Sequence, residues 1–317
     1  MARPSEPGRR EPGRIVDALR RRDRAALVRS THRLGWRYAG RLPQPVVRAL
    51  LAVVSPVVVR RDGAHLRNLR RNLSVVGGRP ATPALLRAGV RSYLRTFWEV
   101  LALPSWSRAE AVGRVRPENE QVVRQAFAGP GAVVALPHSG NWDLAGAWAC
   151  GTGMPVTTVA EQLGEAEFAA FLDFRRSLGM EVLSHREPGL IGTLVTAARG
   201  GRVVCLMADR DLTGGGVEVD FAGRRVSMPV GPALVARRSG AALIPAVAHY
   251  DGQPLRRGAR MSLVVGPVVP SQPGREGLVA MTQGVADFFT ARLREHPEDW
   301  HLMQPFFPAP AASEVTG

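Results

Sequence analysis

The stretch VVALPHSGNWDLAGAW, residues 133–148, joins a run of apolar residues to a polar turn and then to a second apolar segment. The first run has the length and β-branched content of a buried strand, and the second has the pattern of a helix. A strand that leads through a short turn into a helix is the basic unit of α/β proteins. The turn places His138 and Asp143 five positions apart, where such a strand would end.

The same alternation of strands and helices continues after residue 115. It predicts an α/β fold with a mostly parallel central sheet flanked by helices. The expected strands are AVVALPH, PVTTVAE, EVLSH, VVCLMAD, LIPAVAHY and MSLVVGPVV. The expected helices lie near residues 142–152, 165–178, 188–199, 231–239 and 276–295. We expect the segment VEVDFAGRRVSMP to form an antiparallel excursion from this sheet.

The part of the chain before residue 115 has a different, helical pattern, which runs from about residue 13 and ends at Pro104. It contains apolar positions at helical spacing within ATPALLRAGVRSYLRTFWEVLALP. We expect this N-terminal helical segment to pack with the α/β core as one domain. The predicted division is a disordered tail over 1–12, a helical, membrane-associating segment over 13–115, an α/β core over 116–308 and a flexible tail over 309–317.

The charge of the chain is concentrated near its N-terminus. The formal net charge is +15, and residues 1–73 hold 18 of the 42 basic residues but only 5 of the 27 acidic ones. A basic segment is attracted to nucleic acid or to an anionic membrane surface. In residues 33–61 the arginines are mixed with Trp36, Tyr38 and many aliphatic residues, which suits a membrane surface better than nucleic acid.

The apolar residues of this segment are too few for a membrane span. The longest apolar stretch is about fourteen residues and is interrupted by Arg48 and Pro56, whereas a span needs about twenty. We therefore expect surface binding or shallow insertion. The N-terminal sequence MARPSEPGRREPGR lacks the features of a secretory signal, so we expect a peripheral protein at the cytoplasmic face of the cell membrane, with no nucleic acid partner.

The turn after the first strand carries the residues suited to catalysis. Asn141 is a suitable helix cap, and Asp143 then falls in the first helical turn, from which it could reach back to His138. A carboxylate bonded to one ring nitrogen lets the other nitrogen accept a proton from a hydroxyl. Ser139 lacks the Gly-x-Ser-x-Gly surroundings of a hydrolase nucleophile. No metal is expected, because the ligand spacing of a metal site is missing.

Other blocks support a site at the strand ends. Asp209 ends the predicted strand VVCLMAD, so a parallel sheet would bring it into the same crevice as His138. An ion pair with Arg210 or another arginine is an equally plausible role for Asp209. Cys150 and Cys205 are too few for a disulfide framework and are expected to be reduced thiols in the core.

The block LPHSGNWDLAGAW resembles the His-x-x-x-x-Asp block of the lysophospholipid acyltransferase superfamily. The resemblance is to the branch that contains late lipid A acyltransferases and actinobacterial phosphatidylinositol mannoside acyltransferases. It extends in order through VAEQL, FRRSLGMEVL, VVCLMADRDLTGGGVEVDFAGRRVSMPVGPALVA and HPEDWHLMQPFF, or roughly residues 30–308. Ordered blocks over most of the chain are far more specific than one five-residue spacing.

The resemblance implies transfer of a palmitoyl-like acyl group from acyl-CoA, a co-substrate, to a mannose hydroxyl of a phosphatidylinositol mannoside. No other cofactor is implied. His138 would be the general base and Asp143 its partner, with a further acid at Asp209 or, in competition, at Asp211 or Glu218. The residues implied or considered for substrate binding are Arg176, Glu161, Asn141, Arg210 and Asp211. Trp142 and Trp148 are candidates for an apolar groove that holds the acyl chain.

Two alternatives stay open at this point. The chain could carry out the same chemistry on another lipid acceptor, such as a lipid A-like molecule or a lysophospholipid. It could also be a nonenzymatic protein that binds anionic membranes through its basic N-terminal part, with His138 in a structural role.

Overall fold

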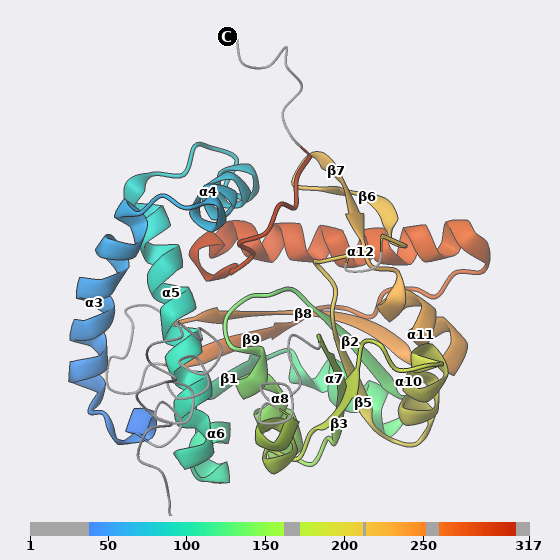
Figure 1. Cartoon of the computed structure of the whole chain (residues 1–317). Helices are drawn as coiled ribbons and strands as arrows, with labels where there is room; N and C mark the ends of the chain where they lie inside the picture. Colours follow the sequence, from blue (N-terminus) through green and yellow to red (C-terminus); the bar gives the residue numbers. More distant parts are fainter. Residues whose placement is uncertain (1–37, 162–171, 212–213, 252–259, 309–317) are drawn as a thin grey trace, which may run out of the picture.

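The structure is a computed structural model that describes residues 38–161, 172–211, 214–251 and 260–308 (Figure 1). Both predicted tails, 1–12 and 309–317, lie outside the described residues. The beginning of the N-terminal helical segment also lies outside them, as does the first part of the helix expected near residues 165–178.

A seven-stranded sheet forms the centre of the fold, in the order β1-β9-β8-β2-β5-β3-β4. Every neighbouring pair is parallel except β8 with β9, so the predicted mostly parallel sheet is confirmed. The strands are β1 (Val115–Glu118), β2 (Ala132–Leu136), β3 (Val156–Ala160), β4 (Glu181–Ser184), β5 (Val203–Met207), β8 (Ala242–Tyr250) and β9 (Met261–Val265). The expected antiparallel excursion is the hairpin of β6 (Val217–Phe221) and β7 (Arg224–Met228).

The helices of the α/β core flank this sheet. They are α7 (Glu120–Ala128), α8 (Trp142–Gly151), α10 (Leu190–Arg199), α11 (Gly231–Ser239) and α12 (Gly274–Glu295), followed by the short 3-10 helix η3 (Pro297–Asp299). Residues 172–177 are also helical. Of the predicted helices, four are found within a few residues of their expected positions, and the described part of the helix expected near residues 165–178 is helical as well. Strand β1 and helix α7 were not predicted.

The two faces of the sheet pack against different helices, because successive side chains of a strand point to opposite sides. On one face, Val133 and Ala135 of β2 join a core with residues of α10, α11 and α12. On the other face, Ala132, Val134 and Leu136 join a core with residues of α7 and α8. Figure 1 shows α12 running across the first of these faces.

The N-terminal part contains separate helices joined by short connections. They are η1 (Ala39–Arg41), α3 (Gln44–Arg60), α4 (Ala64–Val76), α5 (Pro83–Ala102), η2 (Leu103–Ser105) and α6 (Arg108–Gly113). The Thr82 side chain accepts a hydrogen bond from the backbone N–H of Leu85 and so caps α5. Among the described residues, no helix is both long and apolar enough to cross a bilayer.

Helices α3 and α5 lie side by side at one end of the sheet (Figure 1). Helix α5 also packs against η3. This is the end where polar side chains gather. Because β8, β2, β5 and β3 run parallel to one another, their carboxyl ends share one edge. The turn after β2 carries His138, Asp209 follows β5, and Glu161 follows β3. The topology therefore brings distant parts of the sequence to one crevice.

Candidate active site

His138 lies in a tight turn between β2 and α8. Gly140 within this turn has a φ of +55°, a left-handed conformation that favours glycine. A Cβ atom on Gly140 would lie 2.8–2.9 Å from atoms of Ala248, so a larger residue does not fit there. Asn141 ends the turn as the helix cap, its side-chain oxygen accepting a hydrogen bond of 3.0 Å from the Leu144 N–H. The sequence prediction of a cap at Asn141 is confirmed.

Asp209 is the acid that contacts His138. One carboxylate oxygen lies 2.6 Å from the ring Nδ1, and the other accepts a hydrogen bond of 2.8 Å from the His138 backbone N–H. The second oxygen also accepts a hydrogen bond of 2.8 Å from Nε1 of Trp300. Asp209 is fully buried, whereas 26% of the His138 side chain is exposed. The imidazole is therefore fixed from inside the protein and accessible from outside.

The electrostatics of this pair favour a charged imidazole. Burial acts to lower the pKa of His138, but the charge of Asp209 and its hydrogen bond outweigh burial, so the pKa is raised. Burial acts to raise the pKa of Asp209, but the His138 charge and the hydrogen bonds from His138 and Trp300 bring that pKa below its ordinary value. Asp209 can therefore stabilise the imidazolium that forms when His138 accepts a proton.

Asp143 has a different partner from the one predicted. Its two carboxylate oxygens accept hydrogen bonds from Nε and Nη2 of Arg175, at 2.5 and 3.3 Å. The prediction that Asp143 holds the imidazole of His138 is wrong, because Nδ1 already faces Asp209 and the Asp143 carboxylate is bound by the guanidinium. Both partners are buried, with 2% of the Asp143 side chain and 9% of the Arg175 side chain exposed.

The arginine that joins the site is Arg175, and the predicted Arg176 points elsewhere. The Arg176 side chain is 61% exposed and lies 3.6 Å from the Asp173 carboxylate. Consecutive residues of a helix point in directions about 100° apart, so neighbours in sequence can face the interior and the solvent. Arg175 therefore faces the interior beside Asp143, and the predicted role of Arg176 in substrate binding stays a prediction.

Glu161 and Arg210 form an ion pair at the carboxyl ends of β3 and β5. Their Oε2 and Nη1 atoms are 3.0 Å apart, and each side chain is 33% exposed. Both charges act on His138, Arg210 lowering its pKa and Glu161 raising it. The structure thus brings both predicted residues to the rim of the site.

The two competing acids have other contacts. Asp211 accepts hydrogen bonds from the backbone N–H groups of Gly214 and Gly216 and from the Ser227 hydroxyl, and so shapes the following loop. Glu218 lies on β6 with 76% of its side chain exposed, 3.5 Å from Arg225. Of the three acids considered, Asp209 is the one with a described contact to His138.

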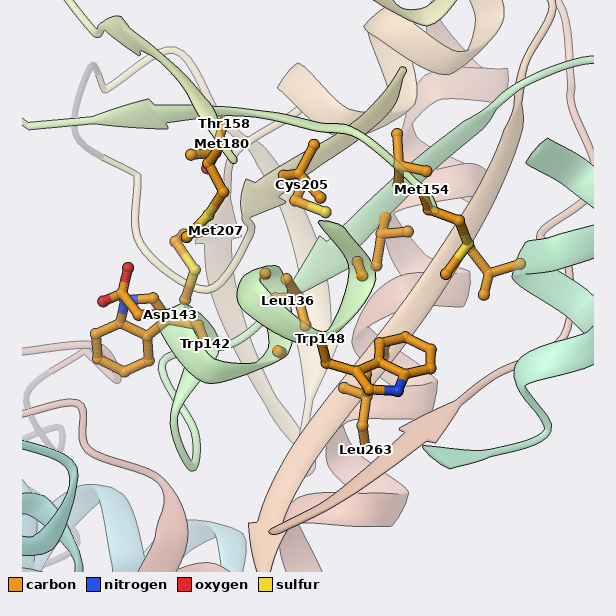
Figure 2. Close-up of a pocket in the computed structure, with 18 of the residues that line it drawn as sticks. Leu136, Trp142, Asp143, Trp148, Met154, Thr158, Met180, Cys205, Met207 and Leu263 are labelled. Atoms are coloured by element: carbon orange, nitrogen blue, oxygen red, sulfur yellow. The ribbon is translucent and has the colours of Figure 1, made fainter. Parts of the chain in front are cut away.

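An apolar cavity opens beside this site, between the sheet and α8. It contains about 710 Å³ of empty space, including the open space at its mouth. Figure 2 shows Trp142 and Asp143 at one end, and Trp148, Met154 and Leu263 at the other. The Trp142 ring also meets the His138 ring edge-on, with centroids 5.4 Å apart. One residue of the cavity wall, Trp142, therefore contacts the imidazole.

The cavity wall is mostly apolar, and its polar residues are Thr158 and the ion pair of Asp143 and Arg175. It includes Val134, Leu136, Val203, Cys205 and Met207 of the sheet. Burial raises the pKa of the Cys205 thiol to about 12, so this wall carries a neutral thiol. Cys150 and Cys205 are both free, as the sequence predicted.

One group of possible metal ligands occurs among the described residues, at His296, Glu298 and Asp299. Asp299 already accepts hydrogen bonds from the Ser92 hydroxyl and the Tyr250 backbone N–H, and it is buried. These contacts use both of its oxygens. The expected absence of a catalytic metal stays a prediction.

Several contacts of the site were missed at the sequence level. Trp300, the donor to Asp209, falls in the block HPEDWHLMQPFF, which was recognised without a role for this residue. Polar residues on α5 also contact the turn of His138 or the groups that bind this turn. They recur at helical spacing within an otherwise apolar stripe, which was the available signal: Ser92, Arg95, Thr96 and Glu99.

Comparison with known proteins gives a family for this arrangement. The model of the family described as "Bacterial lipid A biosynthesis acyltransferase" matches residues 22–308. A phosphatidylinositol mannoside acyltransferase of Mycobacterium tuberculosis (strain CDC 1551 / Oshkosh) is 41% identical over 280 residues, covering 86% of this chain and 85% of that protein. One of Mycolicibacterium smegmatis (strain ATCC 700084 / mc(2)155) is 36% identical over 289 residues, covering 88% and 91%. The chain therefore belongs to the bacterial lipid A biosynthesis acyltransferase family.

Proposed function

We propose that this acyltransferase moves a long fatty acyl group from acyl-CoA to a mannose hydroxyl of a phosphatidylinositol mannoside, with His138 as general base. The acceptor is inferred from the names of the relatives. Each relative is similar to this chain over most of its own length and most of the length of this chain. The observation that carries the chemistry is the His138–Asp209 pair, whose imidazole contacts Trp142 in the wall of an apolar cavity.

In this mechanism Nε2 of His138 accepts the proton of the acceptor hydroxyl as the oxygen attacks the thioester carbonyl. A C–O bond forms, and the carbonyl π electrons move onto oxygen. Collapse of this intermediate breaks the C–S bond, and the proton on His138 passes to the departing thiolate. No acyl-enzyme forms, and no metal or resident cofactor takes part. A positioned base of this kind contributes typically 10²–10⁴-fold to the rate.

Asp209 supports this proton transfer through its two hydrogen bonds with His138, one to the ring and one to the backbone. The hydrogen bond to Nδ1 selects the tautomer in which Nε2 has a free lone pair. The bond to the backbone N–H fixes the position of the residue itself. Trp300 in turn donates to Asp209 and prevents the carboxylate from rotating away.

The cavity is the proposed binding site of the acyl chain. With the thioester at the end beside Trp142, its carbonyl would lie near His138, and the other end, beside Trp148 and Met154, would hold the terminal methyl group. An apolar wall suits a hydrocarbon chain, because burying each methylene contributes about 0.8 kcal/mol. The Glu161–Arg210 pair lies at the rim, and we assign it to contact with the polar acceptor.

The N-terminal helices supply the proposed membrane contact. Helix α3 buries Val47 and Leu51, yet its outer side carries an exposed apolar row at helical spacing. Exposed apolar residues of α5 adjoin it, and the whole set is Leu42, Val46, Leu50, Val53, Val54, Val57, Tyr93 and Phe97. Exposed arginines flank the row at Arg48, Arg60 and Arg61. Apolar and basic groups together suit the surface of an anionic membrane, and we expect peripheral binding at the cytoplasmic face.

The central test is to incubate the purified protein with radiolabelled palmitoyl-CoA and a panel of lipid acceptors. We expect label in phosphatidylinositol mannosides, and loss of this activity in His138→Ala. His65→Ala is the matched control, because His65 is exposed on α4. Label in a lipid A-like acceptor or a lysophospholipid alone would replace the proposed acceptor. Undiminished transfer by His138→Ala would refute the mechanism, and absence of all transfer would favour a nonenzymatic lipid-binding protein.

A further inference from the structure

The turn that carries His138 is bound by several buried groups, which come from the segment around η3 and from α5. The backbone N–H of His301 donates a hydrogen bond of 2.8 Å to the His138 carbonyl. The backbone N–H of Gly140 donates one of 3.0 Å to the Asp299 carbonyl. These bonds fix one side of the turn to the segment around η3.

Helix α5 holds the other side of the same turn. The Thr96 hydroxyl donates a hydrogen bond of 3.0 Å to the Gly140 carbonyl. The Glu99 carboxylate accepts one of 3.1 Å from the side-chain nitrogen of Asn141, whose oxygen caps α8. Thr96 and Glu99 are almost fully buried, at 4% and 3% exposure, so water does not replace these bonds.

Tyr250, at the end of β8, connects these two α5 residues. Its hydroxyl donates a hydrogen bond of 2.9 Å to Glu99 and lies 2.8 Å from the Thr96 hydroxyl. Arg95 balances the buried charge, since its Nε donates to the other Glu99 oxygen at 2.9 Å. The Arg95 guanidinium also lies 3.6 Å above the Tyr250 ring. The carboxylate is thus paired and held in one orientation.

We propose that Thr96 and Glu99 are positioning residues for the acyl transfer, acting on His138 through the Gly140–Asn141 part of its turn. This inference rests on the proposed function, in which His138 is the base. Neither residue has a described contact with the imidazole or lines the cavity. Their effect on the reaction is geometric, because a general base must stay within hydrogen-bond reach of the attacking hydroxyl.

The test compares Thr96→Val, which keeps the shape but removes the hydroxyl, with Thr96→Ser, which restores it. Thr282→Val is the matched control, because Thr282 is equally buried and its hydroxyl also donates to a backbone carbonyl, that of Leu278 in α12. We expect Thr96→Val to lower kcat roughly 10- to 100-fold with little change in KM for acyl-CoA. Thr96→Ser and Thr282→Val should keep kcat near that of the unmodified protein.

A second measurement separates positioning from loss of stability. In protein labelled with ¹⁵N-histidine, NMR titration follows the ring of His138, and we expect its pKa to move in Thr96→Val but not in Thr282→Val. If Thr96→Val does not fold, Tyr250→Phe carries the test, since it removes only the hydroxyl between Thr96 and Glu99. A folded variant with unchanged kcat and unchanged His138 titration would overturn the inference. Failure of the proposed function is recognised separately, by an inactive unmodified protein or an active His138→Ala variant.

Discussion

The Asp209 carboxylate binds His138 twice, once at the ring Nδ1 and once at the backbone N–H of the same residue. It therefore sets both the orientation of the ring and the position of the turn from which the ring projects. Its second oxygen accepts from two donors, the His138 N–H and Nε1 of Trp300. That oxygen cannot be exchanged for an amide nitrogen without losing both bonds.

Because of this double contact, we expect Asp209→Asn to remove the general base from His138. To keep both bonds at the second oxygen, the amide must turn its NH₂ group towards Nδ1 of His138. Nδ1 then has to accept a hydrogen bond, which moves the ring proton to Nε2 and removes the base. We expect kcat to fall by roughly 10³–10⁴-fold. Steady-state kinetics with Asp287→Asn, an exposed residue on α12, provide the control. A loss of less than about tenfold in Asp209→Asn would contradict the assigned role.

The pH dependence of the reaction follows from the raised pKa of His138. The base must be neutral, so kcat/KM should rise with pH and reach half its maximum above the ordinary histidine value of 6.5. Asp209→Asn removes the main group that raises this pKa, so the residual activity should show its midpoint at lower pH. A rate profile measured between pH 5 and about 9 tests both statements, the range being chosen around the ordinary histidine pKa. A midpoint that stays fixed in Asp209→Asn would show that another group titrates.

The same pair links stability to pH. A raised His138 pKa adds stability that is complete below the pKa of the unfolded chain and is lost as pH rises through the folded pKa. The lowered Asp209 pKa adds stability that is lost as pH falls through its own folded value. Denaturant unfolding at several pH values should therefore show that the pair contributes most to the free energy of unfolding at pH values between the folded-state pKa of Asp209 and that of His138.

We expect a substitution of Asp143 to have a different effect from a substitution of Asp209, because Asp143 pairs with Arg175 and not with the imidazole. Asp143→Ala removes the carboxylate from this buried ion pair, and breaking such a pair typically costs about 3–5 kcal/mol of the free energy of unfolding. We expect a clear loss of stability in denaturant unfolding, while the pH midpoint of the remaining activity stays in place. A shift of that midpoint equal to that of Asp209→Asn would return Asp143 to the role predicted from the sequence.

The contrast between these two acids shows what the sequence could predict about the site. The location of Asp209 near His138 could be predicted from topology, because the carboxyl ends of parallel strands lie at one edge of the sheet. Recognising the strands in the sequence was enough for this prediction. The partner of Asp143 depends on Arg175, 32 positions away on another helix. The spacing of residues within the segment that holds Asp143 contains no information about such a distant partner. The sequence therefore pointed to the nearby imidazole of His138 as the partner of Asp143. Arg176 was assigned by resemblance to a family block, and which of the two neighbouring arginines faces the interior depends on the packing of their helix.

The fold was more predictable than the site, for a physical reason. Buried parallel strands are continuous apolar runs, and β2, β5 and β9 are visible as such in the sequence. Strand β1 was missed because its residues Arg116, Pro117 and Glu118 are partly exposed at the edge of the sheet. Proline is tolerated at such an edge, where one side of the strand has no hydrogen-bonding partner.

We expect the size of the cavity to determine which acyl chain length the enzyme prefers in its donor. Val203 lies in the wall, while its neighbour Val204 belongs to the core on the opposite face of the sheet. Val203→Met should shorten the cavity, so that the preferred donor becomes shorter than palmitoyl-CoA. Each methylene that no longer fits should cost roughly 10-fold or more in kcat/KM. Competition assays with acyl-CoA donors of different length measure the shift. Val204→Met is the control for overpacking, and an identical shift in both variants would argue against this cavity as the acyl site.

The exposed row on α3 predicts that membrane binding can be removed without unfolding. Val53 is 68% exposed, so Val53→Asp leaves no cavity in the core, yet it places a charge of the wrong sign against anionic lipid. We expect weaker sedimentation with vesicles that contain anionic phospholipid and an unchanged thermal unfolding midpoint. Val268→Asp is the control, since Val268 is a 46% exposed valine in the segment after β9. Equal loss of vesicle binding in both variants would mean that added charge alone is responsible, whereas selective loss in Val53→Asp assigns the contact to α3.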